Sequence, residues 1–97
     1  MNLSINAEAE LELTEGALYY AQKANKFIAE AFLSEFDRSA KLLVENPKFG
    51  TPWRGRIRRL PLRRFPYSIV DYLRESEVRI LAVAHQRRRP GFWQGRS

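Results

Sequence analysis

The sequence predicts one α+β domain, residues 1–97, in which a helical hairpin packs on one antiparallel sheet in the order β-α-α-β-β-β. Three observations predict this fold class. Apolar residues recur at helical spacing in two successive stretches before Pro47. After Pro47 the pattern changes to the alternation and the β-branched runs of strands. A chain of 97 residues has the length of one domain and not of two.

The first element is expected to be a short strand from Leu3 to Asn6, followed by a helix from Ala7 to Ala24. Asn6 suits the N-cap position, because its side chain can accept a hydrogen bond from the first turn. Apolar residues of this helix share one face at spacings of three, four and seven. Tyr19 and Tyr20 are adjacent, so one of the two must face outward.

A second helix is expected from Lys26 to about Glu45, with Asn25 as the cap between the two helices. It ends at Asn46-Pro47, because the residue before a proline avoids the α region. Three aromatic residues of this helix are expected in the core: Phe27, Phe32 and Phe36.

The second half reads as a loop and a three-stranded meander. Residues 47–55 contain two Pro and two Gly and are expected to form a loop. Strands are expected from about Arg54 to Leu60, from Tyr67 to Leu73 and from Val78 to His85, with a polar turn over 74–77. The last strand is nearly continuous in apolar residues, which predicts burial on both faces at the centre of the sheet. The first strand is expected to pair with one of these three.

Charge divides the chain into two halves. Residues 1–52 hold five Lys or Arg and eight Asp or Glu, whereas residues 53–97 hold twelve Arg, no Lys and three Asp or Glu. The planar fork of Arg matches phosphate or carboxylate through two hydrogen bonds. The asymmetry therefore predicts an anionic partner, either a nucleic acid or an acidic protein segment.

Several classes of protein are excluded by composition. There is no Cys, so disulfides and thiolate metal sites are excluded, and a single His predicts neither a metal site nor a metal cofactor. The N-terminal MNLSINAEAE lacks the basic flank and apolar run of a signal peptide. The longest apolar run, Ile80 to Ala84, is far below the ~20 residues that span a bilayer. We expect a cytoplasmic protein without a membrane partner.

Four stretches in this order resemble the RelE/ParE superfamily of type II toxins: AEAELEL…ALYYA, ENPKFGTP, RRFPYSIVDY and ILAVAHQRRRPGFW. The resemblance implies the fold described above and neutralisation by a cognate antitoxin, whose flexible C-terminal segment wraps over the toxin in a hetero-oligomer. RelE-like members cut mRNA in the ribosome, whereas ParE-like members poison DNA gyrase and are not known as enzymes. The FPYSIVDY strand and the HQRRRP end look more ParE-like, so we expect a gyrase inhibitor. The alternative is a ribosome-dependent mRNA endonuclease.

A metal-free ribonuclease needs a base, a cation beside the phosphate and an acid. The chain is rich in cations but has no carboxylate between Glu45 and Asp71, so no residue is assigned as catalytic. If the chain is a nuclease, the candidates are Arg56, Arg58, Arg64, His85 and Arg87. His85 is either the base or a strand-end histidine hydrogen-bonded to the backbone. Asp71 lies among arginines, which predicts a structural ion pair.

The basic tail is the expected surface for the target. Arg87, Arg88 and Arg89 precede Phe92 and Trp93, a combination that can grip phosphates and stack on bases. An alternative role for the two aromatic residues is to fold back and cover a face of the sheet.

The antitoxin is expected to place an acidic, amphipathic segment in an apolar groove between the helices and the sheet. The residues expected to contact it are Tyr19, Tyr20, Arg56 and Arg58.

Overall fold

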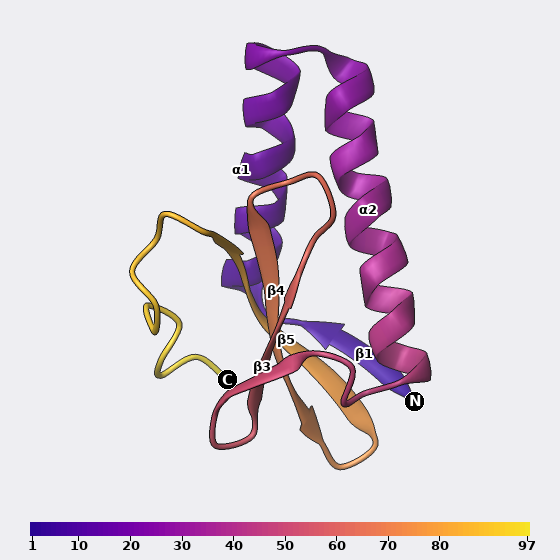
Figure 1. Ribbon diagram of the computed structural model, residues 1–97, viewed down its shortest axis with the longest axis vertical. Helices are drawn as coiled ribbons and strands as arrows, with labels where there is room; N and C mark the ends of the chain where they lie inside the picture. Colours follow the sequence, from indigo (N-terminus) through magenta and orange to yellow (C-terminus); the bar gives the residue numbers. More distant parts are fainter.

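Two helices cover one face of a five-stranded sheet, and the C-terminal tail lies against the other face (Figure 1). The computed structural model describes residues 1–97. In chain order the elements are β1 (Asn2–Ile5), α1 (Ala7–Lys23), α2 (Lys26–Glu45), β2 (Thr51–Arg54), β3 (Ile57–Pro61), β4 (Tyr67–Arg74) and β5 (Glu77–His85). The predicted fold class, a helical hairpin on a sheet in the order β-α-α-β-β-β, is confirmed.

The sheet differs from the prediction in being mixed. Its strand order is β1-β5-β4-β3-β2, and β1 runs parallel to β5, while the other neighbours are antiparallel. Parallel neighbours need a long crossover connection. The helical hairpin and the meander supply this connection between β1 and β5. As predicted, β5 is an interior strand with a continuous buried run, although β4 is the central one.

The expected loop over residues 47–55 contains a strand that the sequence did not predict. Thr51–Arg54 forms β2 and pairs with β3 through a tight turn at Gly55 and Arg56. Pro52 is tolerated there because β2 is the edge strand of the sheet, where one side of the backbone has no partner.

Both helices begin at the predicted caps. The Asn6 carboxamide oxygen accepts a hydrogen bond of 2.8 Å from the backbone N–H of Ala9. The Asn25 carboxamide oxygen accepts one of 3.0 Å from Ile28. Each cap satisfies one of the N–H groups that a helix start leaves without a partner.

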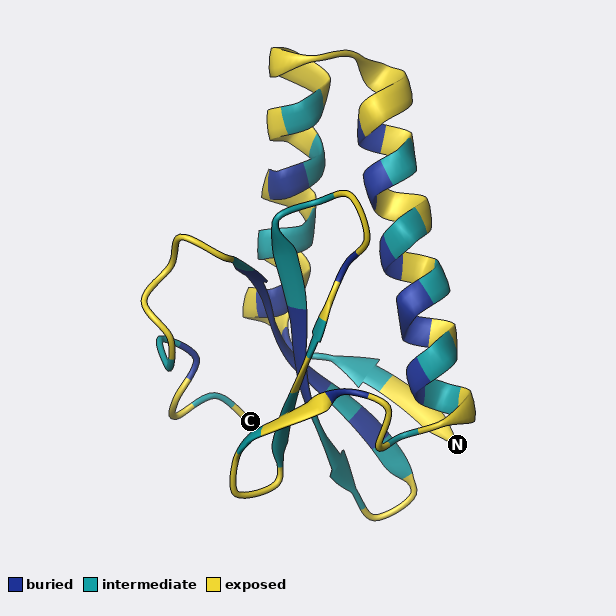
Figure 2. Cartoon of the chain, in the orientation of Figure 1, coloured by how far each residue is buried: buried dark blue, intermediate teal, exposed yellow.

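Aromatic residues form the centre of the core beneath the hairpin. Phe32 is fully buried, and its ring lies between 4.9 and 5.3 Å from the rings of Tyr20, Phe65 and Tyr67. Phe36 is buried in the same cluster. The prediction for Phe27 is wrong, because 68% of this residue is exposed. It lies at the closed end of the hairpin, which projects beyond the sheet and is exposed around the turn (Figures 1 and 2).

Asp71 is fully buried, and the predicted ion pair is absent. Neither carboxylate oxygen has a hydrogen-bond partner. Arg58 lies opposite Asp71 in the β3–β4 register, but its guanidinium donates instead to the main-chain oxygens of Lys48 and Gly50, at 3.3 and 3.1 Å. Burial raises the pKa of the Asp71 carboxyl to about 7, and the charge of Arg58 opposes this rise.

Gly16→Ala should destabilise the fold although alanine favours helices by about 1 kcal/mol over glycine. A Cβ at Gly16 would lie 2.9 Å from two ring carbons of Phe32. That ring is enclosed by its aromatic neighbours, so we expect a net loss of roughly 1–3 kcal/mol in urea unfolding. Thr14→Ala, at an exposed position of the same helix, is the matched control and should be neutral or stabilising. A Gly16→Ala protein as stable as this control would contradict the close packing.

Asp71 should make the protein less stable as the pH rises. The pKa of Asp71 is higher in the folded chain than its ordinary value of 3.8, so the folded state holds a proton that the unfolded state has lost. The free energy of unfolding should therefore fall between pH 3.8 and about 7, by up to about 1.4 kcal/mol per pH unit. Urea unfolding at pH 5 and pH 8 measures this fall, and Asp71→Asn should abolish most of it.

Glu35 does not interfere with that measurement. The Arg38 side chain and the Arg63 N–H lower the pKa of Glu35 to about 2, so its contribution is lost only at pH values below its ordinary 4.5. An Asp71→Asn protein that declined between pH 5 and pH 8 as steeply as the parent chain would refute the assignment to Asp71.

Candidate functional site

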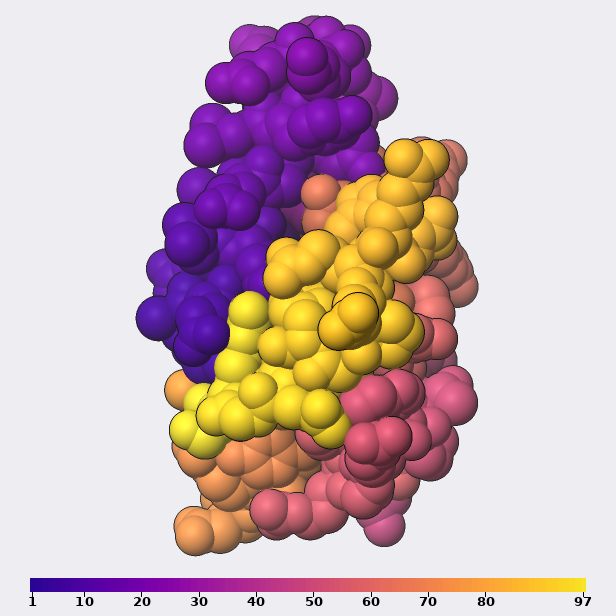
Figure 3. Space-filling view, turned by 90° about the vertical axis from the view of Figure 1, so that its left-hand side faces the viewer, coloured from indigo at the N-terminus to yellow at the C-terminus, as the bar shows by residue number.

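The tail, residues 86–97, folds back across the face of the sheet that the helices leave free. Figure 3 shows it running between α1 and the residues of β2 and β3. Trp93 is only 2% exposed and belongs to a second apolar cluster with Val70, Leu81, Ala82 and Ala84. The Trp53 and Phe92 rings each lie 5.1 Å from the Trp93 ring. Trp93 therefore covers the sheet, and in this conformation it does not offer its ring to a target.

One ion-pair network fixes the end of the tail to α1. The Arg96 guanidinium lies 2.9 and 3.1 Å from the two carboxylate oxygens of Glu12 and 3.0 Å from a carboxylate oxygen of Glu8. It also donates to the main-chain oxygen of Leu81 at 3.1 Å. Hydrogen bonding to Glu12 raises the pKa of Arg96, so the guanidinium stays charged. No pattern in the sequence singles out Glu12 or Arg96, which lie 84 positions apart.

The three consecutive arginines of the tail have different environments. The Arg88 guanidinium stacks 3.8 Å from the Phe92 ring centroid and lies 4.0 Å from a Glu12 oxygen. Arg87 and Arg89 are exposed, and neither side chain forms an ion pair. Arg88 therefore helps to fix the tail, while Arg87 and Arg89 stay free to bind an anion.

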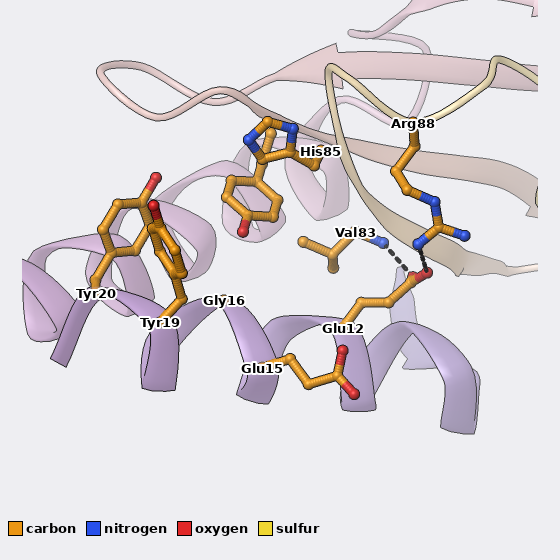
Figure 4. Close-up of a pocket in the computed structure, with 9 residues that line it drawn as sticks. Glu12, Glu15, Gly16, Tyr19, Tyr20, Val83, His85 and Arg88 are labelled. Carbon is orange, nitrogen blue, oxygen red and sulfur yellow. Dashed lines mark hydrogen bonds and ion pairs between the residues drawn. The ribbon is translucent and has the colours of Figure 1, made fainter. Parts of the chain in front are cut away.

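His85 lies at the end of β5, beside an open pocket of about 300 Å³ between α1 and the start of the tail (Figure 4). Its Nδ1 accepts a hydrogen bond of 3.0 Å from the Arg87 N–H, and its ring lies 4.9 Å from the Tyr67 ring. The packed, backbone-bonded histidine is the alternative that the structure supports. No carboxylate is hydrogen-bonded to the imidazole to orient it as a base.

The other nuclease candidates are dispersed over the molecule. Arg56 lies at the β2–β3 turn, and Arg58 is bonded to the main chain after α2. Arg64, with a positive φ of 69°, lies in the β3–β4 connection beside a hollow formed with α2. The structure therefore does not gather the five candidates around one phosphate. No group of three or more His, Asp or Glu is placed to hold a metal ion.

The residues expected to contact an antitoxin also differ in exposure. Tyr19 is 54% exposed, whereas Tyr20 turns inward against Phe32 and Phe65. Arg56 is exposed, but the hydrogen bonds of Arg58 to the main chain give it a structural role. Neither helix has the length and apolar character needed to cross a membrane.

Trp93→Ala should destabilise the domain severely. Removing a buried aromatic side chain costs about 3–5 kcal/mol, so we expect a large fall in the thermal midpoint measured by circular dichroism. Trp93→Phe should recover part of the loss, because it refills part of the cavity. Arg89→Ala, an exposed change in the same tail, is the control and should melt like the parent chain. A Trp93→Ala protein with an unchanged melt would assign this ring to recognition of a target.

Comparisons with known proteins agree with the fold and the sequence patterns. Residues 3–90 match the family described as the ParE toxin of the type II toxin–antitoxin system parDE. A solved structure described as the chromosomal ParDE system from P. aeruginosa is similar in fold, with a TM-score of 0.77 and 24% identity over 88% of this chain and 95% of that one. No curated protein matches. Because the family match covers most of the chain, this protein belongs to the ParE toxin family of type II toxin–antitoxin systems.

Proposed function

We propose that this toxin acts in the cytoplasm by binding and inhibiting DNA gyrase, without covalent chemistry of its own, and that a cognate antitoxin neutralises it. The observation that carries this proposal is the absence of an assembled acid–base site. His85 accepts a hydrogen bond from the backbone N–H of Arg87, and the arginines that would surround a scissile phosphate lie in separate parts of the fold. A chain built in this way is suited to binding rather than to cleavage.

The position of exposed apolar residues supports a protein partner on the helical side. The large exposed apolar side chains are Met1, Leu3, Leu11, Leu18, Tyr19, Phe27, Ile28, Leu33 and Phe49. All of them precede β2, and most lie on α1 and α2. Exposed apolar residues of this kind mark protein interfaces. We therefore propose that the apolar part of the antitoxin segment packs on the hairpin around Tyr19.

Gyrase inhibition is tested with the purified toxin and a relaxed plasmid. We expect the toxin to block ATP-dependent supercoiling by gyrase and the purified antitoxin to restore it. His85→Ala should inhibit as well as the parent chain per folded molecule, because the proposed mechanism does not use the imidazole. Unimpaired supercoiling at saturating toxin would rule out gyrase as the target.

The pocket beside His85 favours a second candidate function, that of a ribosome-dependent mRNA endonuclease. Tyr67, Arg88 and Glu15 line the same pocket, so the residue types that cleavage needs lie near His85, although none of the three is hydrogen-bonded to it. Programmed ribosomes incubated with the toxin distinguish the two functions. Message cleavage that is lost in a folded His85→Ala protein would establish the nuclease.

A further inference from the structure

The turn between β2 and β3 carries two arginines whose guanidinium groups stack on aromatic rings. Arg54 lies 4.8 Å from the ring centroid of Trp53, and Arg56 lies 5.3 Å from that of Tyr72. Gly55 stands between them with a positive φ of 57°, which makes the tight turn possible. Contact with the ring limits the freedom of each guanidinium, so less side-chain entropy is lost when it binds a ligand.

Neither of these arginines has a charged or hydrogen-bonded partner within the chain. Both are exposed, and neither takes part in an ion pair or a side-chain hydrogen bond. They line an open hollow of about 380 Å³ together with Tyr72, Arg96 and the end of the tail. Asp and Glu are absent from the sequence between residues 46 and 70 and from residue 78 onward. Of the three arginines at the hollow, Arg96 is paired with Glu8 and Glu12, so Arg54 and Arg56 supply its unpaired positive charge.

Further arginines without an ion pair lie on β3 and in the tail. The exposed arginines of β2, β3, their turn and the tail that form no ion pair are Arg54, Arg56, Arg59, Arg87 and Arg89. Between residues 51 and 97 no large apolar side chain is exposed. A protein interface needs apolar anchors at its centre, whereas a nucleic-acid interface is polar and positively charged. The sheet and tail side has the composition of a nucleic-acid interface.

We propose that Arg54 and Arg56 bind the phosphate backbone of duplex DNA, independently of its sequence. The inference deepens the proposed function, since gyrase holds a DNA segment that a bound toxin could contact. On this view the toxin has two sides: an apolar helical side for a protein, and an arginine side for DNA. Each guanidinium would donate two hydrogen bonds to the oxygens of a phosphate and displace condensed counterions.

The test uses the purified toxin and a short fluorescein-labelled duplex of mixed sequence, without gyrase. Fluorescence anisotropy over a series of NaCl concentrations gives the slope of log K against log salt. Each phosphate contact contributes about −0.9 to that slope, so the double variant Arg54→Gln, Arg56→Gln should have a slope shallower by about 1.8. The loss of affinity should be the same for duplexes of different sequence.

The matched control is the double variant Lys23→Gln, Lys41→Gln. It removes the same charge from exposed and unpaired positions on α1 and α2. It should keep the slope of the parent chain. An equal loss of slope in both double variants would show that only net charge matters and would overturn the site. Absence of DNA binding by the parent chain, with binding of labelled polyglutamate that the arginine variant loses, would assign the two arginines to an acidic protein instead.

The outcome is separable from that of the proposed function. DNA binding that depends on Arg54 and Arg56, without inhibition of supercoiling, would keep this site and reject gyrase as the target. Inhibition of supercoiling by a chain that does not bind DNA would keep gyrase as the target and reject the DNA-binding site.

Discussion

The Glu12 carboxylate, paired with Arg96, joins three parts of the molecule: helix α1, the edge of β5 and the C-terminal tail. β1 pairs with β5 only as far as Ile80, so the following residues of β5 have no strand beside them on that side. Glu12, on α1, accepts a hydrogen bond of 3.0 Å from the Val83 N–H at this open edge and at the same time pairs with Arg96. The two side chains are only 12% and 13% exposed, so losing either one would leave a largely buried charge without its partner. Helix, sheet edge and tail are therefore held together by the Glu12–Arg96 pair.

The Glu12–Arg96 pair also explains why the exposed arginines and the exposed apolar side chains lie on different sides of the domain. The tail covers the second face of the sheet with Trp93, so that face exposes arginines but no large apolar side chain. The helical side keeps its exposed leucines and Tyr19, because neither the sheet nor the tail reaches over the outer surface of the hairpin. The domain therefore has two chemically different sides: exposed apolar side chains lie on the helical side, and exposed arginines lie on the sheet and tail side.

Local signals in the sequence were sufficient for most of the fold. Both helix starts were predicted because Asn6 and Asn25 act on residues three positions away. The apolar run of β5 predicted its burial directly. Phe27 was misplaced because helical periodicity says nothing of how far a hairpin extends beyond its sheet. The short edge strand β2 was missed because proline and glycine usually indicate a loop.

The candidate site was less predictable, because its contacts join distant parts of the chain. No pattern in the sequence connects Glu12 with Arg96, and the burial of Asp71 without a partner depends on Arg58 turning towards the main chain after α2. Parallel pairing of β1 with β5 is likewise decided by the path of the whole chain. The arginine-rich composition did indicate an anionic partner, but it did not show which arginines the fold would use for itself.

Whether an arginine stabilises the fold or stays free to bind a ligand depends on the side chains beside it. Arg96 and Arg88 are drawn to Glu12, and Arg58 holds the loop after α2, so these three stabilise the fold. Arg54 and Arg56 rest on aromatic rings, which orient a guanidinium without neutralising it. A carboxylate partner neutralises the charge of an arginine, whereas an aromatic partner leaves that charge available to a ligand. The tail can therefore be structural at one residue and free to bind at the next, and its role has to be assigned residue by residue.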